Sequence, residues 1–236
     1  MIPKRLRILP PYPPVVVALD EPWNSAKIWV DRLKGRVWGF KVGSILFAER
    51  GPTVVEEILN SGARVFLDLK YHDIPNTVQL SVRRAVSWGV SLITVHAWGG
   101  HAMLKAAAAE QKPDQRVVAV TVLTSLDQED LKQAGVLGDL EGQVQRLATL
   151  AINSGIAGLV SSPHEVADLR ERFPEATLVT PGIRLDPGTD DQKRTLGIDE
   201  TLRAGSDLAV VGRVLTMATD WEKQWERITS STAGMS

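Results

Sequence analysis

Short apolar runs alternate with amphipathic segments along most of the chain. The apolar runs are rich in Val, Ile and Leu and mostly continuous, which is typical of strands buried on both faces of a parallel sheet. We predict strands over residues 15–20, 37–43, 64–70, 92–97, 116–123, 156–162, 176–183 and 207–213. The segments between them have helical periodicity, and we predict helices over residues 25–34, 52–60, 76–88, 101–111, 143–154, 164–173, 200–204 and 221–228.

Eight strand–helix units in one chain favour a closed barrel. The chain has 236 residues, and (β/α)8 barrels commonly reach about 250 residues as one domain. An open doubly wound sheet is the alternative. Such a sheet often carries a glycine-rich turn after its first strand, whereas Ala18 to Pro22 reads A-L-D-E-P. We therefore predict an α/β fold of the (β/α)8 TIM barrel type, with an N-terminal arm over residues 1–14 and one catalytic domain over residues 15–230.

Composition argues against several classes of protein. Apolar residues make up 44% of the chain, which is enough for a sizeable core, and 27 Lys and Arg balance 28 Asp and Glu. A balanced charge gives no strong electrostatic footprint for nucleic acid. The absence of cysteine excludes disulfides and thiolate metal sites and fits a reducing compartment. No run approaches the roughly 20 apolar residues of a transmembrane helix, and residues 1–14 lack the apolar stretch of a signal peptide. We expect a cytoplasmic protein with neither a nucleic-acid nor a membrane partner.

Polar residues gather where the predicted strands end, which is where barrel enzymes place their active sites. These residues are Asp20, Lys41, Asp68, Lys70, His96, Thr124, Ser125, Ser161, Ser162, Arg184, Gly212 and Arg213. One such residue alone is more often a turn former or a solvated charge. However, Lys41, Asp68 and Lys70 lie within otherwise apolar strands, where an unpaired charge is costly. We therefore expect these three charges to be paired with one another.

The spacing of the charged residues predicts their arrangement. Asp68 and Lys70 are two positions apart on one strand and so face the same side of it. Asp73 follows after a short loop, and Lys41 comes from the adjacent strand. Neighbouring carboxylates favour the charged form of the Lys70 ammonium group. This suits Lys70 to donate a proton rather than to form a Schiff base, which needs a neutral amine.

Two long connections follow the fifth and seventh predicted strands, over residues 125–142 and 184–199. Barrels often bind phosphate near strands seven and eight, and Arg213 beside Gly212 can offer guanidinium and backbone N–H donors to a phosphate. The second connection is long enough to close over a ligand as a lid. The histidines are not spaced as metal ligands on a helix, so we expect no metal site.

One segment carries a recognisable signature. Phe66 to Thr77 reads F-L-D-L-K-Y-H-D-I-P-N-T and resembles the D-x-K-x-x-D signature of the orotidine 5′-phosphate decarboxylases. Seven more segments resemble the bacterial form of that family in the family's order: V-V-V-A-L-D ending at Asp20, F-K-V-G around Lys41, V-H-A-x-G-G from Val95, A-V-T-V-L-T-S from Ala119, V-T-P-G-I-R ending at Arg184, D-D-Q-K-R around Gln192 and V-V-G-R ending at Arg213. Related sugar-phosphate barrels share part of the short signature, whereas the ordered set is highly specific.

The resemblance implies cofactor-free decarboxylation of orotidine 5′-phosphate to UMP and CO2, the last step of de novo UMP synthesis. Lys70 would protonate C6 of the pyrimidine, Asp68 would lie near the departing carboxylate, and Lys41 and Asp73 would complete the charge array. In the family the second aspartate comes from the partner subunit, so the resemblance implies a homodimer with shared active sites. The substrate-binding residues that it implies are Asp20, Lys41, Asp68 and Thr77 near the ribose and reacting carbon, Thr124 and Ser125 at the pyrimidine, Gln192 between base and phosphate, and Arg184, Gly212 and Arg213 toward the phosphate. Ile74 is also expected to bind the substrate.

Two other functions remain open from the residues. A related barrel, a sugar-phosphate synthase or decarboxylase, would use Asp68 and Lys70 with Mg²⁺, so EDTA would abolish its activity. A non-catalytic module that binds a phosphate ligand would turn over nothing.

Overall fold

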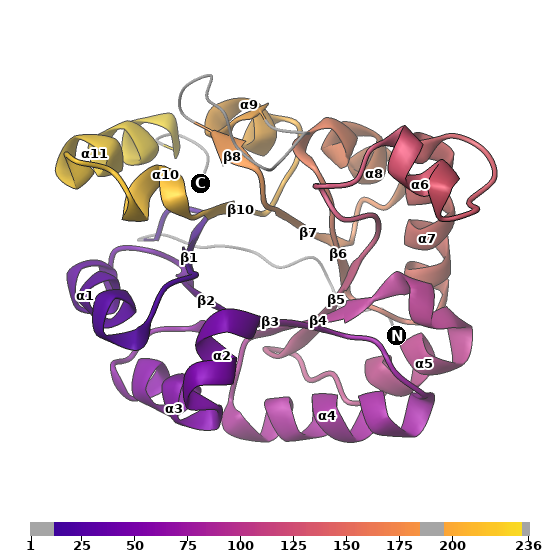
Figure 1. Ribbon diagram of the computed structural model, residues 1–236, viewed down its shortest axis with the longest axis horizontal. Coiled ribbons are helices and arrows are strands. Elements are labelled where there is room, and N and C mark those ends of the chain that lie inside the picture. The colour runs from indigo at the N-terminus through magenta and orange to yellow at the C-terminus, as the bar shows by residue number, and fades with distance from the viewer. Residues whose placement is uncertain (1–11, 185–195, 233–236) are drawn as a thin grey trace.

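The strands close into a parallel barrel. The computed structural model describes residues 12–184 and 196–232, and Figure 1 shows their arrangement. The strands follow one another around the barrel in the order β1-β10-β7-β6-β5-β4-β3-β2, and every neighbouring pair is parallel. The barrel strands are β1 (Val15–Leu19), β2 (Gly39–Gly43), β3 (Val65–Tyr71), β4 (Leu92–His96), β5 (Arg116–Val120), β6 (Gly158–Val160), β7 (Thr177–Thr180) and β10 (Leu208–Val211). The predicted (β/α)8 barrel is confirmed.

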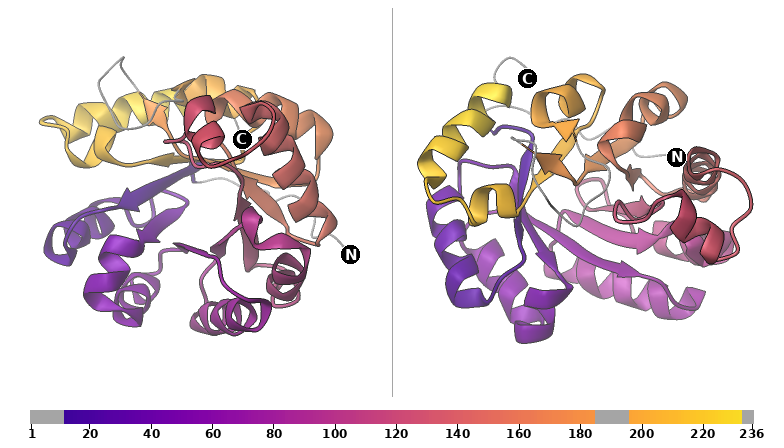
Figure 2. Two further views of the ribbon diagram at one scale, coloured as in Figure 1. Left: turned by 45° about the vertical axis from the view of Figure 1, so that its right-hand side comes forward. Right: turned by 45° about the horizontal axis from the view of Figure 1, so that its top comes forward.

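Helices form a layer around the outside of the strands, as the turned views in Figure 2 show. The helices are α1 (Trp23–Leu33), α2 (Ser44–Arg50), α3 (Pro52–Asn60), α4 (Pro75–Trp88), α5 (Gly100–Ala108), α6 (Gln128–Gln133), α7 (Leu140–Asn153), α8 (Val166–Arg172), α9 (Ile198–Arg203), α10 (Arg213–Thr216) and α11 (Trp221–Thr232), with short 3₁₀ turns η1 (Ala97–Gly99) and η2 (Pro163–Glu165). Within the described ranges, none of these helices combines the length and the apolar character needed to cross a bilayer.

Two apolar layers explain why the strand sequences are continuously apolar. Val16 and Phe66 pack inside the barrel with the other inward-facing residues, whereas Val17 and Leu67 pack outward against the helices. All four side chains are buried. Because both faces of each strand are covered, alternate residues need not be polar, as the sequence pattern predicted.

The structure differs from the predicted elements mainly at their ends. The fifth strand ends at Val120 rather than at residue 123, and the sixth covers only Gly158–Val160 of the predicted 156–162. Three short helices, α2, α6 and α10, were not predicted, and α6 lies inside the connection that we expected to be a loop. Its start has a local signal, because the Asp127 carboxylate accepts hydrogen bonds from the N–H groups of Glu129 and Asp130 as a helix cap.

A small second sheet lies beside the barrel after β7. The predicted strand over residues 176–183 ends in the barrel at Thr180, and its last part belongs to β8 (Ile183–Arg184), which pairs with β9 (Leu196–Gly197). This pairing joins the two ends of the predicted lid at its base. Residues 185–195, including Gln192, lie outside the described residues, so the lid and the role of Gln192 stay predictions.

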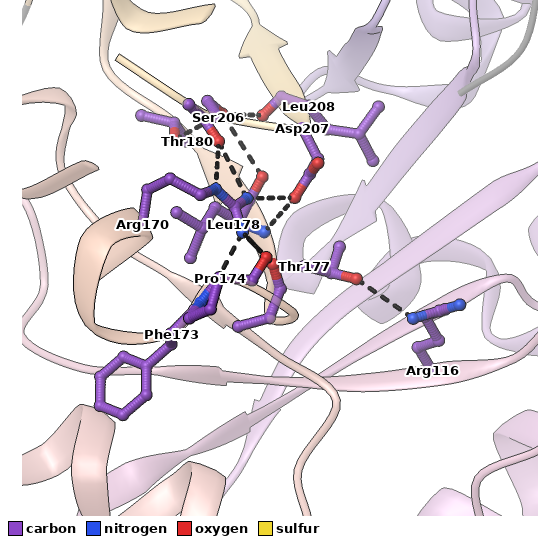
Figure 3. A network of polar contacts seen from close by, with 12 residues as sticks. Arg116, Arg170, Phe173, Pro174, Thr177, Leu178, Thr180, Ser206, Asp207 and Leu208 are labelled. Carbon is purple, nitrogen blue, oxygen red and sulfur yellow. Dashed lines mark hydrogen bonds and ion pairs between the residues drawn. The ribbon is translucent and has the colours of Figure 1, made fainter. Parts of the chain in front are cut away.

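A buried ion pair connects neighbouring elements at the N-terminal end of the barrel (Figure 3). Arg170 of α8 donates to the Asp207 carboxylate at 2.7 Å, immediately before β10. The same carboxylate oxygen accepts the N–H of Leu178 in β7 at 2.8 Å. Arg170 also donates to the carbonyl oxygens of Gly205 and Ala176. The guanidinium therefore holds α8, β7 and β10 together at the end of the barrel opposite the predicted active site.

Candidate active site

Four charged side chains form a continuous array at the C-terminal ends of β1, β2 and β3. The Lys41 ammonium lies 2.9 Å from Asp20 Oδ1 and 3.6 Å from Asp68 Oδ2. The Lys70 ammonium lies 2.8 Å from the same Asp68 oxygen. Charged side chains from three strands thus lie in the order Asp20, Lys41, Asp68, Lys70. The expected pairing of Lys41, Asp68 and Lys70 is present.

Asp68 is the centre of this array and is only 8% exposed. Burial by itself raises the pKa of the Asp68 carboxyl. The attraction of the Lys41 and Lys70 ammonium groups, with hydrogen bonds from Lys70 and Thr94, outweighs burial and holds that pKa below its ordinary value. Asp68 is therefore ionised at neutral pH, and it fixes both lysines beside one oxygen.

The backbone of Lys70 departs from a regular strand. Lys70 has φ 49°, in the left-handed region, and is the one non-glycine residue with positive φ among those described. The register between β3 and β4 shifts between Leu67 and Tyr71, as at a β-bulge. The Lys70 N–H donates to Thr94 Oγ1 at 2.8 Å. Backbone strain of this kind persists only where surrounding contacts hold it, and it is found frequently at functional sites.

Two histidines flank Lys70. His96, the last residue of β4, stacks on His72 with ring centroids 5.5 Å apart and an interplanar angle of 27°. Burial, followed by the positive charges that His72 and Lys70 can carry, lowers the pKa of His96 to about 4. No hydrogen-bond partner for the buried His96 Nδ1 lies among the residues that the structure describes. The imidazole of His96 is consequently neutral at physiological pH and adds no further cation beside Lys70.

Asp73 and its neighbours lie on the exposed segment that follows β3. The Asp73 carboxylate accepts the N–H of Ile74 at 2.6 Å, and in the described part of the chain it forms no ion pair with Lys70. Ile74 is 66% exposed, and Thr77 in the first turn of α4 is exposed as well. One end of the predicted charge array thus lies at the protein surface.

The predicted base and phosphate residues lie after other strands of the same barrel end. Thr124 and Ser125 follow β5, and Gly212 follows β10 directly. A Cβ atom added to Gly212 would lie 3.5 Å from that of Ala18 in β1, which places Gly212 at the barrel mouth. Arg213 is exposed at the start of α10, and Arg184 ends β8.

One residue of the site was missed by the sequence reasoning. Thr94 is fully buried, donates to Asp68 Oδ1 at 3.0 Å and accepts from the Lys70 N–H. A signal existed, because Thr94 precedes His96 by two positions and therefore faces the same side of β4. The spacing could place Thr94 toward the barrel interior, but it could not show the bulge that directs Lys70 N–H to it.

The chemical capacity of the site follows from its charges. An ammonium group held beside a carboxylate at the barrel mouth stabilises negative charge that develops on an adjacent atom, and it can donate a proton to that atom. The Lys70 side chain is 38% exposed, so a ligand can reach it. Among the described residues, no group of three or more His, Asp or Glu side chains is placed to hold a metal ion.

Comparisons with known proteins agree on one family. The profile of the orotidine 5′-phosphate decarboxylase / HUMPS family matches residues 13–228. The orotidine 5′-phosphate decarboxylase of Hydrogenovibrio crunogenus is 44% identical over 218 residues, covering 89% of this chain and 92% of that protein. The Moorella thermoacetica enzyme of the same name is 45% identical over 219 residues, covering 87% of this chain and 86% of that protein.

Solved structures give the same result. The crystal structure of orotidine 5′-phosphate decarboxylase from Lactobacillus acidophilus superposes with a TM-score of 0.82 at 32% identity, covering 94% of this chain and 100% of that chain. An uncharacterized conserved protein from Geobacillus kaustophilus superposes with a TM-score of 0.78 at 33% identity, covering 92% and 99% of the two chains.

Proposed function

The chain belongs to the orotidine 5′-phosphate decarboxylase / HUMPS family and converts orotidine 5′-phosphate to UMP and CO2, and from that premise we propose that Lys70 is the proton donor of the reaction. The observation that carries this proposal is the shared Asp68 oxygen, 2.8 Å from the Lys70 ammonium and 3.6 Å from that of Lys41. One Asp68 oxygen is shared between two ammonium groups, and this holds the Lys70 ammonium at the barrel mouth.

The reaction balances with these residues alone. The bond between C6 and the carboxylate breaks, CO2 leaves, and the electron pair stays on C6. A proton from the Lys70 ammonium forms the new C6–H bond, and solvent then reprotonates the amine. The positive charge is most useful while the negative charge is growing on C6, so it stabilises the transition state more than the ground state. In this proposal Asp68 lies beside the departing carboxylate and keeps Lys70 in place.

Substrate binding is distributed over the barrel mouth in this proposal. Asp20, Lys41 and Thr77 contact the ribose region, Thr124 and Ser125 hold the pyrimidine, Gln192 bridges base and phosphate, and Arg184, Gly212 and Arg213 hold the phosphate. Ile74 also contacts the substrate. The phosphate lies far from the reacting carbon, so its binding free energy can order the site around the base. The single catalytic domain over residues 15–230, the cytoplasmic location and the lack of a nucleic-acid partner remain parts of the proposal.

We also propose a homodimer in which the partner subunit's Asp73 completes each site. Two features of the chain support it. The Asp73 carboxylate bonds only its neighbour's N–H among the described contacts and lies on an exposed loop. Ile45, Ile74 and Trp98 are 62%, 66% and 41% exposed, and they follow the ends of three neighbouring strands, β2, β3 and β4. Exposed large apolar side chains on neighbouring loops are typical of a protein–protein interface. A twofold interface would let each subunit contribute Asp73 to the active site of the other.

The test of the function is an absorbance assay of orotidine 5′-phosphate consumption with metal-stripped protein and EDTA present. We expect full activity in the parent and a loss of most turnover in Lys70→Ala, because the Lys41 ammonium is held by Asp20 and Asp68 and does not take the place of the Lys70 ammonium. Lys27→Ala is the matched control, since Lys27 is an exposed lysine of α1 paired with Asp31.

Each alternative has a different outcome in this assay. Activity that disappears with EDTA would indicate the Mg²⁺-dependent sugar-phosphate chemistry. A parent protein that binds the substrate without consuming it would indicate a binding module. Near-normal turnover in Lys70→Ala would refute the proton-donor assignment.

A further inference from the structure

Thr94 joins the two residues on which the proposed chemistry depends. Its hydroxyl accepts the backbone N–H of Lys70 at 2.8 Å and donates to Asp68 Oδ1 at 3.0 Å. Thr94 is fully buried in the middle of β4, so water does not compete for either bond. One hydroxyl therefore uses its donor and one acceptor position in the site.

The two hydrogen bonds have separate effects, one on the Lys70 backbone and one on the Asp68 carboxylate. At the shifted register between β3 and β4 the Lys70 N–H is directed to a side-chain oxygen instead of a strand carbonyl. A buried N–H without an acceptor costs about 1–3 kcal/mol, and the left-handed φ of 49° at Lys70 is unfavourable for a residue with a Cβ atom. The second bond occupies Asp68 Oδ1, which leaves Oδ2 as the oxygen that both Lys41 and Lys70 contact.

We propose that Thr94 is a positioning residue for decarboxylation: it holds the strained Lys70 backbone and orients the Asp68 carboxylate so that one oxygen serves both lysines. This inference rests on the proposed role of Lys70 as proton donor. Thr94 does not contact the substrate in this proposal, and its effect passes through the placement of the Lys70 ammonium relative to C6.

The test compares Thr94→Val with Thr94→Ser. Valine keeps the shape of threonine and removes both hydrogen bonds, whereas serine keeps the hydroxyl and loses only a methyl group. Misplacing a catalytic group by about 1 Å can cost 10²-fold in rate, so we expect kcat of Thr94→Val to fall on the order of 10²-fold with little change in KM. Thr94→Ser should recover most of that loss.

Thr180→Val is the control for the loss of a buried hydroxyl. Thr180 is also fully buried, and its hydroxyl bonds Ser206 instead of the site. We expect its kcat to equal that of the parent. Thermal unfolding of all variants, followed by circular dichroism, shows whether any loss of rate comes from loss of fold.

The pH profile separates positioning from simple packing. The Thr94 hydrogen bond is the smallest of the effects that lower the pKa of Asp68. Its removal should therefore move the acid limb of the kcat/KM profile slightly to higher pH in Thr94→Val and leave it in place in Thr94→Ser. A packing defect alone would lower stability without moving this limb.

Several results would overturn the proposal. One is a Thr94→Val enzyme whose kcat stays within about tenfold of the parent, which corresponds to about 1.4 kcal/mol of barrier. Another is a lowered kcat with an unmoved acid limb. If Thr94→Val does not fold, Thr94→Cys replaces it, because a thiol is close in size to the serine hydroxyl and only a weak hydrogen-bond donor; equal activity of the Cys and Ser variants would then refute the idea. A parent protein that fails to decarboxylate would instead refute the proposed function, so the two failures are distinguishable.

Discussion

The ion pair between Arg170 and Asp207 allows stability to be separated from chemistry. We consider Asp207→Ala, which removes a carboxylate whose side chain is only 4% exposed. The substitution leaves the nearly buried Arg170 guanidinium without this anion and leaves Leu178 N–H without its acceptor. Both effects act in the folded state, so the variant should unfold more easily than the parent.

The size of the effect follows from the contacts that remain. Breaking a buried ion pair by removing one partner costs about 3–5 kcal/mol. Arg170 keeps hydrogen bonds to the carbonyl oxygens of Gly205, Pro174 and Ala176. These bonds reduce the free-energy cost of removing Asp207, so we expect the lower half of that range. For a chain of this size each kcal/mol lowers the midpoint of thermal unfolding by about 2–4 °C, so a cost of about 3–4 kcal/mol should lower the midpoint by about 6–16 °C.

Thermal unfolding gives the shift in midpoint, and urea unfolding gives the change in the free energy of unfolding. Both are followed by tryptophan fluorescence, since the chain has seven tryptophans. Parent and variant are compared at one protein concentration, because association of subunits would shift both curves. Asp31→Ala is the control: Asp31 lies in an exposed pair with Lys27, and its loss should leave the unfolding curve nearly unchanged.

Asp207→Ala also tests whether the N-terminal end of the barrel contributes to catalysis. Arg170 and Asp207 are at the N-terminal end of the barrel, and residues there serve stability rather than catalysis in this fold. We expect kcat at 25 °C to equal that of the parent. A destabilisation below about 1 kcal/mol would refute the assigned strength of the ion pair, and a large loss of kcat in folded protein would refute the separation of the two ends.

Two further predictions concern the site. Because the folded-state pKa of His96 is lowered to about 4, the unfolded chain binds a proton there that the native protein does not. The free energy of unfolding should therefore fall as pH drops from about 6.5 toward 4, less steeply in His96→Phe, and an NMR titration with a midpoint near 6.5 would contradict this. The proposed shared site predicts that mixing inactive Lys70→Ala and Asp73→Ala subunits restores activity, because one of the two sites in a mixed dimer would be intact; no recovery after confirmed subunit exchange would count against sharing.

Much of the fold could be read from local patterns. Strands such as β4 and helices such as α3 were predicted within a residue or matched at both ends, because apolar periodicity and terminal Pro or Gly residues are local signals. The short helices α2, α6 and α10 were missed because seven, six and four residues make too few turns for a periodic pattern. The true end of β5 at Val120 was missed because the apolar run continues through Leu123 although strand pairing with β6 stops at Val120.

The sequence by itself determined which charges would meet. Lys41, Asp68 and Lys70 sit at fixed positions in successive apolar strands, and parallel strands bring such positions to one end of a barrel. It could not determine how those charges are held. The left-handed backbone of Lys70, its bond to Thr94 and the stacking of His72 on His96 all depend on the shifted register between β3 and β4. Register is a relation between two strands that are distant in sequence, and it is decided only when the whole barrel closes and each strand packs against both neighbours.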